Sequence, residues 1–509
     1  MKKIIFTVIT SLLIFTSCSD DFVENPPTGT LDTEYVFSTE ENVEKAVLGL
    51  YDLMQYNYAK DWHSAYFVKL LPGDDANAAG GNAGDQAQLQ DIDDYANVSI
   101  SNTSITSNWD LFYRVIALAN VIVDNVEGSS LSNKAKVLAE AKFMRAWCYF
   151  ELTTMWGDVP LRLHNPDVVS PEAFALAKSP RTEIYTQVES DLTEAITGLP
   201  DKSAVSENFR VCKGTAQALM GKVLVFQEKY SQAIPYLAAV IANPAHDLEP
   251  DPANVWTIGS EFGIESLFEL GYISTEGYDW GSFKWGGRVE SNAHIILMGT
   301  RDFFDVAPVG LLNGWGFNLP TKKLIDAFDA MGDTERKAAT LMTEAELIAG
   351  GGAVKEPAEN IWDYEGAIRI KYTTRASDTS PEGTVRELNY TTNWRLLRYA
   401  EVLLLAAEAY NKDGQDGQAL IELNKVHERA GLAPLSGLTG DALFNAIVNE
   451  KFLELAHEGQ RFWDLVRWGR AATELAGTGY ASKNDLFPIP VTEIELNDAL
   501  TNADQNPGY

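Results

Sequence analysis

Apolar residues recur at intervals of three and four through two long regions of the chain, a spacing that gathers them on one face of a helix. In the clearest example the apolar positions are Trp109, Phe112, Ile116, Ala119 and Val123. Similar patterns run through residues 134–156 and 181–199, and each is followed by a glycine or proline stop signal. The chain is therefore predicted to be mostly α-helical.

Two later segments carry small residues at the same offset. Gly221 is followed twelve residues later by Ala233, and Ala407 is followed at the same distance by Ala419. Small residues at such offsets let two antiparallel helices approach closely, as in the tetratricopeptide helix–turn–helix unit of about 34 residues. We expect a tetratricopeptide-type scaffold of about four helix pairs, and an unspecific helical bundle is the alternative.

Three segments between the helical blocks have no long periodic pattern: residues 72–106, 256–318 and 350–393, the last with short strands. Long irregular segments inside a compact protein are usually functional or disordered. The second segment combines glycine with many aromatic residues, which argues against disorder. We expect these long loops and short strands to carry the ligand surface.

The beginning of the chain has the pattern of a secretory signal. Basic residues at positions 2 and 3 precede about a dozen apolar-rich positions, 4–15, whereas a membrane-spanning helix needs roughly 20. Phe15-Thr16-Ser17-Cys18 resembles a bacterial lipoprotein box. This implies a signal peptide of residues 1–17 and acyl chains, such as palmitate, on Cys18. An ordinary secreted protein with an incidental cysteine is the alternative.

Charge and cysteine content exclude several classes of protein. The formal net charge of −32 repels phosphate backbones and anionic headgroups, so nucleic acid is not an expected partner. It also favours lipid attachment over electrostatic adhesion to a membrane. Beyond Cys18 only Cys148 and Cys212 remain, too few for a disulfide framework, and we expect both to be small buried side chains.

Residues suited to catalysis are sparse. The six histidines are scattered without a pair at metal-ligand spacing, and the chain has no nucleophile elbow, phosphate loop or dinucleotide fingerprint. We therefore predict a protein that is not an enzyme and that holds neither a metal nor a cofactor. A glycoside hydrolase is the third hypothesis, because it would need only two carboxylates across a cleft.

Several longer motifs follow one another in a fixed order. Among them are FMRAWCYFEL at 143–152, WGDVPL at 156–161, RYAEVLLLAAEAY at 398–410, ELAHEGQRFWDLVRWG at 454–469 and LFPIP at 486–490. In these motifs the chain resembles the SusD/RagB family over essentially its whole mature length. We divide it into an N-terminal region, residues 18–330, and a C-terminal region, residues 331–509, which together form one compact structural domain.

The resemblance implies a function in nutrient uptake. Members of this family are outer-membrane lipoproteins that cover a SusC-like TonB-dependent transporter and capture oligosaccharides, or peptides in some branches. The implied location is the cell outer membrane, facing the exterior, and the implied partners are the transporter, an oligosaccharide and membrane lipid. Structural roles are expected for Trp315, Arg461, Trp463, Asp464 and Trp468.

The ligand residues are sought in the irregular segments, because a sugar needs aromatic rings for its apolar faces and polar groups for its hydroxyls. The main candidates lie in a glycine-rich loop: Tyr278, Trp280, Phe283 and Trp285, with Asp279 and Arg288. A second candidate surface comprises Trp62, Tyr66, Asp74 and Asn77. The alternative is that the rings only pack the loop onto the scaffold.

Overall fold

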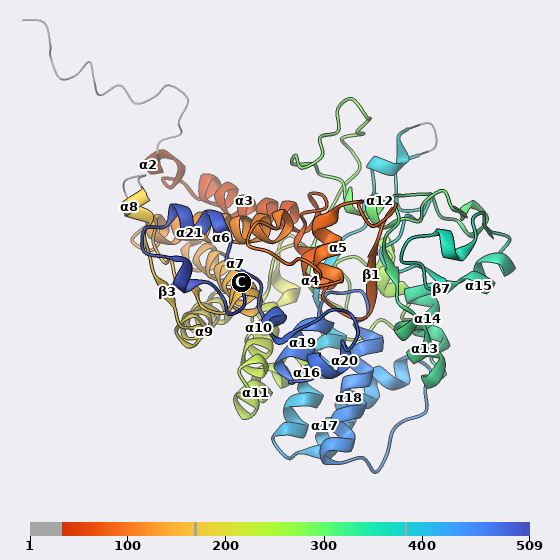
Figure 1. Ribbon diagram of the computed structural model, residues 1–509. Coiled ribbons are helices and arrows are strands. Elements are labelled where there is room, and N and C mark those ends of the chain that lie inside the picture. Colours follow the sequence, from red (N-terminus) through yellow and green to blue (C-terminus); the bar gives the residue numbers. More distant parts are fainter. Residues whose placement is uncertain (1–32, 167–170, 382–383) are drawn as a thin grey trace, which may run out of the picture.

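The computed structural model describes residues 33–166, 171–381 and 384–509 (Figure 1). The predicted signal peptide and Cys18 lie outside the described residues. Nine long helices of this part are α3 (Glu40–Ala59), α6 (Thr103–Val126), α7 (Lys134–Trp156), α9 (Arg181–Gly198), α10 (Lys213–Phe226), α11 (Tyr230–Ile241), α16 (Tyr399–Lys412), α17 (Asp416–Arg429) and α18 (Gly440–Glu454).

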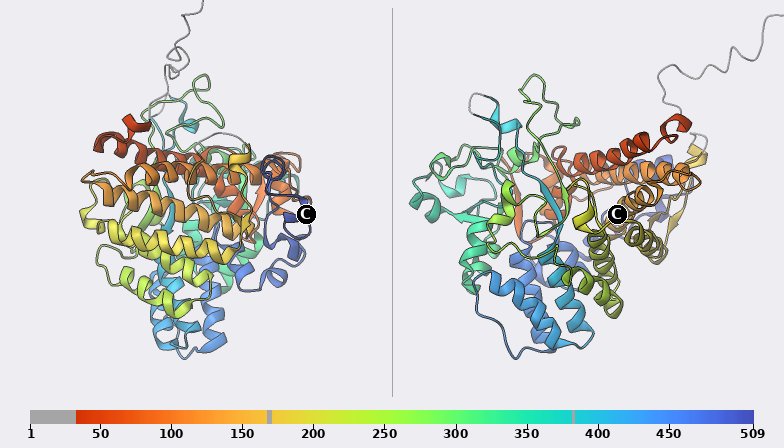
Figure 2. Two further views of the ribbon diagram at one scale, coloured as in Figure 1. Left: turned by 90° about the vertical axis from the view of Figure 1, so that its left-hand side faces the viewer. Right: turned by 180° about the vertical axis from the view of Figure 1, so that it is seen from behind.

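The long helices stack in chain order. Helix α3 packs on α6, α6 on α7, α7 on α9, α9 on α10, α10 on α11, and α11 on α16, which in turn contacts α17 and α18. The left view of Figure 2 shows the N-terminal helices of this stack as successive layers, coloured from red to yellow-green. The predicted mostly α-helical, tetratricopeptide-type fold is confirmed, with consecutive pairs α3/α6, α7/α9, α10/α11 and α16/α17.

Short helices connect and flank this stack. They are α2 (Thr33–Val36), α4 (Ala65–Leu70), α5 (Ala87–Asp93), α8 (Pro171–Phe174), α12 (His294–Met298), α13 (Lys322–Met331), α14 (Thr334–Thr340), α15 (Glu344–Ala349), α19 (Arg461–Arg467), α20 (Ala471–Glu474) and α21 (Val491–Leu496). No helix within the described ranges combines the length and the apolar character needed to cross a bilayer.

The strands are short and form antiparallel pairs. These pairs are β1 (Ala76–Ala79) with β6 (Phe317–Pro320), β2 (Val159–Pro160) with β3 (Lys178–Ser179), β4 (Ser266–Leu270) with β10 (Trp394–Arg398), β5 (Phe304–Asp305) with β8 (Ala353–Val354), and β7 (Leu341–Thr343) with β9 (Ala367–Arg369). In the β4–β10 pair, Trp394 lies opposite Leu270 and Arg398 opposite Ser266.

One continuous hydrophobic core contains residues from both sides of the predicted regional boundary at residue 330. The predicted buried cysteines, Cys148 and Cys212, belong to buried parts of the scaffold. Near the C-terminus, the Trp463 Nε1–H donates to the Lys69 carbonyl at 3.2 Å. The Asn506 Nδ2–H likewise donates to the carbonyl of Trp156, the last residue of α7, at 2.9 Å. The end of the chain is thereby bonded to its N-terminal half.

Several ion pairs join α19 to other elements. Arg461 Nε lies 2.7 Å from an Asp74 oxygen, next to β1. Asp464 pairs with Lys451 of α18 at 2.7 Å and, within α19 itself, with Arg467 at 2.8 Å. The charged residues of this motif therefore hold α19 against the rest of the molecule.

A buried ionic network joins the C-terminal helices to the strands. The Glu454 carboxylate of α18 accepts hydrogen bonds from Arg398 at 2.6 Å, from Arg336 at 3.2 Å and from Arg429. Arg398 also donates to Glu265 at 2.7 Å. Burial alone would raise the pKa of Glu454, but the three guanidinium groups lower it well below its usual range.

The small residues of the scaffold allow the close helix contacts that their spacing predicts. A Cβ atom at Gly221 of α10 would lie 2.4 Å from Leu237 Cδ2 of α11. Three residues, 227–229, separate these two helices, and Ala233, Ala407 and Ala419 are all fully buried. The helix backbones therefore approach each other at positions where a larger side chain has no room.

We predict that Gly221→Ala lowers the free energy of unfolding by about 1–3 kcal/mol, because the added methyl group overpacks the α10/α11 contact. The matched control is Gly417→Ala in α17, where an added Cβ would meet nothing within 4 Å. There the substitution should be neutral or stabilising by roughly 0.5 kcal/mol through helix propensity. Thermal and urea unfolding measure both. A Gly221→Ala protein as stable as wild type would contradict this account of the packing.

Candidate functional site

The glycine-rich loop that follows β4, residues 271–288, stands above the helices, as the green loop at the top of Figure 1 shows, and we call it the aromatic loop. Its inner side is bonded to the scaffold: the Tyr278 N–H donates to Asn389 Oδ1 at 2.9 Å, and the Tyr56 hydroxyl donates to the Gly286 carbonyl at 2.7 Å. Phe283 is buried against Ala293 and Leu388. In contrast, Trp280 is 57% exposed.

Three half-buried tryptophans from distant segments meet beside this loop. The ring centroids of Trp62 and Trp285 lie 5.1 Å apart, and Trp315 lies 5.4 Å from each of them. We call Trp62, Trp285 and Trp315 the tryptophan cluster. The sequence suggested Trp62 and Trp285 for two separate surfaces and Trp315 for a structural role, but the fold brings all three side chains together.

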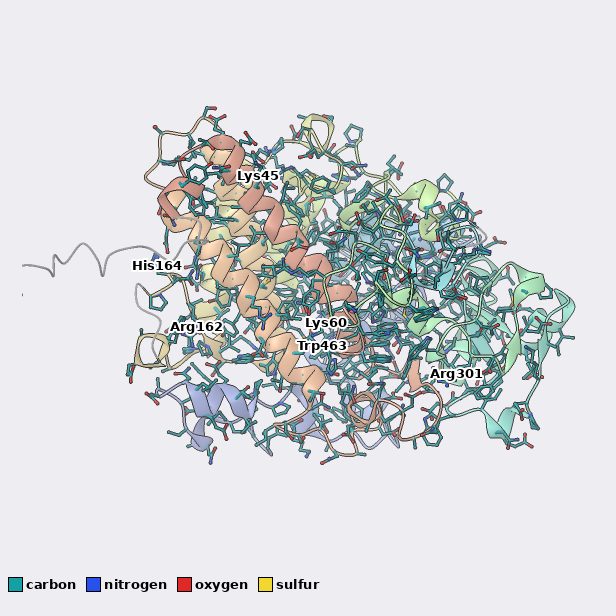
Figure 3. The ribbon with its side chains drawn as sticks, turned by 90° about the horizontal axis from the view of Figure 1, so that it is seen from above. Lys45, Lys60, Arg162, His164, Arg301 and Trp463 are labelled. Carbon is teal, nitrogen blue, oxygen red and sulfur yellow. The ribbon has the colours of Figure 1, made fainter. Side chains whose placement is uncertain are left out.

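Two arginines belong to the segments that carry the cluster. Arg288 forms an ion pair with Asp52 of α3, and Arg301 donates to the Trp315 carbonyl at 3.0 Å and to Asp85 at 3.2 Å. Figure 3 shows the molecule from above, with Lys60 at the end of α3 and Arg301 labelled. Arg301 was not expected from the sequence, because nothing local distinguishes it from other surface arginines.

The Asp279 side chain stabilises a turn within the loop. Its carboxylate accepts hydrogen bonds from the N–H groups of Gly281 and Ser282, both at 2.8 Å. These bonds lower the pKa of this fully exposed carboxyl. The turn that they close leads directly from Trp280 to Phe283.

The second predicted surface has to be corrected. Tyr66 is buried, stacks on Trp394 with centroids 4.3 Å apart, and donates its hydroxyl hydrogen to the His457 carbonyl at 2.5 Å. Asp74 is buried in ion pairs with Arg461 and Lys323. The Asn77 amide donates to the Asp363 carbonyl at 3.1 Å. Since the polar atoms of Tyr66 and Asp74 already hold the fold together, we remove these two residues from the ligand surface, and we keep Trp62 and the part-buried Asn77 as candidates.

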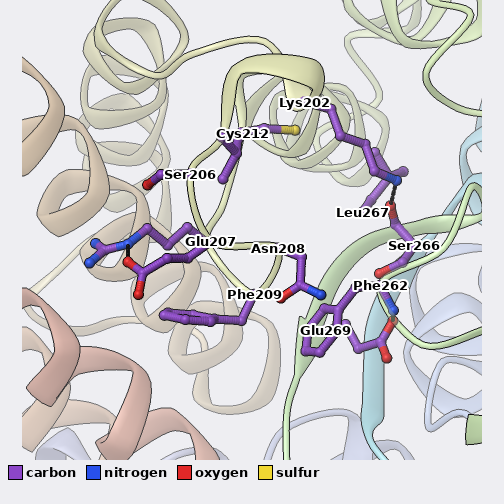
Figure 4. Close-up of a pocket in the computed structure, with 12 residues that line it drawn as sticks. Lys202, Ser206, Glu207, Asn208, Phe209, Cys212, Phe262, Ser266, Leu267 and Glu269 are labelled. Carbon is purple, nitrogen blue, oxygen red and sulfur yellow. Dashed lines mark hydrogen bonds and ion pairs between the residues drawn. The ribbon is translucent and has the colours of Figure 1, made fainter.

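Two adjoining pockets lie between α3, β4 and the loop of residues 202–212. One has a volume of about 430 Å³ and is lined by Asp52 and Gln55 of α3 and by Gly271. The other, shown in Figure 4, has a volume of about 580 Å³ and lies between residues 202–212 and β4. Both are lined by Phe209, Phe262 and Glu269. We call the two together the phenylalanine groove, which the sequence did not suggest.

A carboxyl group on the groove wall has an unusual acidity. Burial raises the pKa of Glu261 to about 7, although the Asn393 N–H, which donates to Glu261 Oε1 at 2.8 Å, and the Arg395 guanidinium oppose the rise. At neutral pH this group is therefore present in both protonation states. It can accept or donate a hydrogen bond to a molecule in the groove.

One buried pair of side chains resembles the serine nucleophile and the histidine base of a catalytic site. Ser64 Oγ lies 2.7 Å from His294 Nε2. Both side chains are completely buried, and burial lowers the pKa of His294 to about 3. A group that is inaccessible and this weakly basic cannot activate a serine toward a ligand. Within the described part of the chain, no three His, Cys, Asp or Glu side chains are grouped to hold a metal ion.

Two family models match the chain. The one described as "SusD family" matches residues 342–485, and the one described as "Starch-binding associating with outer membrane" matches residues 21–225. Among curated proteins, the chain is 29% identical over 543 residues to SusD-like protein P2 of Formosa agariphila, with 100% of both chains covered. It is 25% identical over 477 residues to the starch-binding protein SusD of Bacteroides thetaiotaomicron, with 82% of each covered.

Solved structures share the fold. A laminarin-binding SusD-like protein superposes with a TM-score of 0.82 at 29% identity, covering 92% of this chain and 100% of that one. Surface glycan-binding protein A from Bacteroides fluxus superposes with a TM-score of 0.78 at 25% identity and the same coverage.

We predict that Glu261→Gln stabilises the protein at alkaline pH. Because its folded pKa of about 7 lies above the ordinary value of 4.5, ionisation destabilises the folded state as pH rises from 4.5 through 7. The amide removes this penalty, so the free energy of unfolding should increase by about 1–2 kcal/mol at pH 8 and hardly change at pH 4. Melting curves at both pH values, with exposed Glu359→Gln as control, test this. An equal effect at both pH values would contradict it.

Proposed function

The chain belongs to the SusD/RagB family, and from this premise we propose that it is a cell-surface lipoprotein that captures oligosaccharides and delivers them to a SusC-like TonB-dependent transporter of the outer membrane. The observation that carries this proposal is the tryptophan cluster, whose member Trp285 lies on the same loop as the exposed Trp280. Aromatic faces stack on the C–H faces of sugar rings, and the neighbouring charged groups can bond their hydroxyls.

The relatives support a glycan as ligand. A solved relative at 29% identity is named as laminarin-binding, another at 25% as glycan-binding, and a curated relative as starch-binding. The strongly negative chain, with a net charge of −32, favours an uncharged glycan over an acidic polysaccharide. These names describe binding and not hydrolysis, which supports a role without enzymatic activity.

Membrane attachment is part of the same proposal. The family model that matches residues 21–225 is described as associating with the outer membrane, and the lipoprotein box proposes Cys18 as the acylated residue. Each buried methylene of an acyl chain contributes about 0.8 kcal/mol to membrane binding. Several chains on one cysteine would therefore anchor the protein on the outer face of the membrane without a spanning helix.

We predict that Trp280→Ala and Trp285→Ala both weaken glycan binding, by about 3- to 10-fold for each lost stacking contact. Calorimetry with laminarin and its oligosaccharides measures the change. Trp280→Ala should leave the melting temperature unchanged because its ring is mostly exposed. Trp285→Ala should also lower it, because this ring packs on Phe283 with centroids 4.9 Å apart as well as on the cluster.

The control is Tyr35→Ala, an exposed aromatic residue on α2, far from the loop in Figure 1. It should change neither glycan binding nor stability. If the wild-type protein binds peptides from a panel but binds no glycan at millimolar concentration, the proposal is wrong. Membership of the peptide-binding branch of the family would then be favoured.

A further inference from the structure

The two pockets of the phenylalanine groove adjoin each other and share wall residues. Phe209, Phe262 and Glu269 line both the pocket of about 430 Å³ and the pocket of about 580 Å³. The first pocket follows the side of α3, and the second opens between the loop of residues 202–212 and β4 (Figure 4). Together the two pockets extend from α3 to the loop of residues 202–212, an extent that suits a chain better than a compact molecule.

Phe262 is held in place where the two pockets meet. Its backbone has a φ of +53°, which residues other than glycine rarely adopt. Its N–H donates to Glu269 Oε2 at 3.0 Å, and Glu269 in turn accepts a hydrogen bond from Asn393 at 2.9 Å. A Cβ atom at Gly271 would lie 3.0 Å from Phe262 Cζ. The ring is thus fixed over the glycine at which the aromatic loop leaves β4.

Phe209 supplies a second half-exposed ring. It meets Tyr51 edge to face, with centroids 5.5 Å apart and planes at 83°. The residues just before it, Ser206, Glu207 and Asn208, are exposed and line the same pocket. Two aromatic rings beside hydroxyl, carboxylate and amide groups are the combination that a sugar chain requires.

Helix α3 links the groove with the segment that carries Trp62 of the tryptophan cluster. Asp52 lines the groove and pairs with Arg288 of the aromatic loop. The Gln55 amide donates to the Gly271 carbonyl at 2.7 Å. From Asp52 to the end of α3 at Ala59 the helix rises about 10 Å, and Trp62 follows within three residues. One ligand chain can therefore run beside α3 from the groove to the cluster.

We infer that the phenylalanine groove is a second glycan subsite, which binds the distal part of an uncharged polysaccharide chain whose other part stacks on the tryptophan cluster. This inference rests on the proposed function. The carboxylates along the groove, among them Asp52, Glu207 and Glu290, disfavour an acidic polysaccharide as occupant. Two linked subsites strengthen binding of chains that reach both and leave the binding of short chains unchanged.

The test is calorimetry with laminaritriose and with laminarin on the full chain. Phe209→Ala removes one ring, and Asn208→Arg fills the groove from an exposed loop position where the substitution does not disturb the core. Both variants should bind laminarin about tenfold more weakly than wild type and laminaritriose equally well. Phe209→Tyr should restore laminarin binding. Trp285→Ala should weaken the binding of both glycans. Melting curves test whether each variant is folded.

The possible failures are distinguishable. If wild type binds both glycans and the folded groove variants bind laminarin as tightly as wild type, the second subsite is overturned while the proposed function stands. The same holds if the groove variants lose both glycans equally. If wild type binds neither glycan, the proposed function fails, and the inference that rests on it fails with it.

Discussion

The fold depends on one buried carboxylate that must remain paired. Glu454 of α18 accepts hydrogen bonds from Arg336, Arg398 and Arg429, which come from three other elements. Removing one partner of such a group leaves an uncompensated buried charge, which typically costs 3–5 kcal/mol. The C-terminal helices, the end of β10 and α14 are therefore constrained to one relative position. The pairing specifies an arrangement that apolar contacts alone would leave less well defined.

The position of the candidate site follows from this constraint. Arg398 is the last residue of β10, and β10 pairs with β4, from which the aromatic loop begins. Asn393, next to β10, accepts a hydrogen bond from the Tyr272 N–H at 2.9 Å and donates one to Glu269 at 2.9 Å. The ionic network thus fixes a strand pair, and the strand pair fixes both the root of the loop and the wall of the groove. An irregular loop gains a defined position because its two ends are held.

Tryptophan has two different roles in this molecule. Buried tryptophans such as Trp109 and Trp156, with centroids 5.5 Å apart, fill the helical core. Trp62, Trp285 and Trp315 pack on one another but remain partly exposed at the surface. A ring that is fixed by its neighbours and still open on one side binds a sugar with little loss of side-chain freedom. Exposure, rather than residue type, therefore separates the candidate ligand residues from the packing residues.

The sequence by itself determined the helical scaffold, the close contact at Gly221, the family and the loop that carries Trp280 and Trp285. These features follow from local spacing or from ordered motifs, which can be seen along the chain without knowing which segments meet. Only the tertiary structure showed that Tyr66 and Asp74 are buried, that Trp62 and Trp315 join Trp285, and that Phe209 and Phe262 line one groove. Those facts depend on contacts between residues that are far apart in the chain, and no local period records which of two similar aromatic residues will be covered by a distant segment.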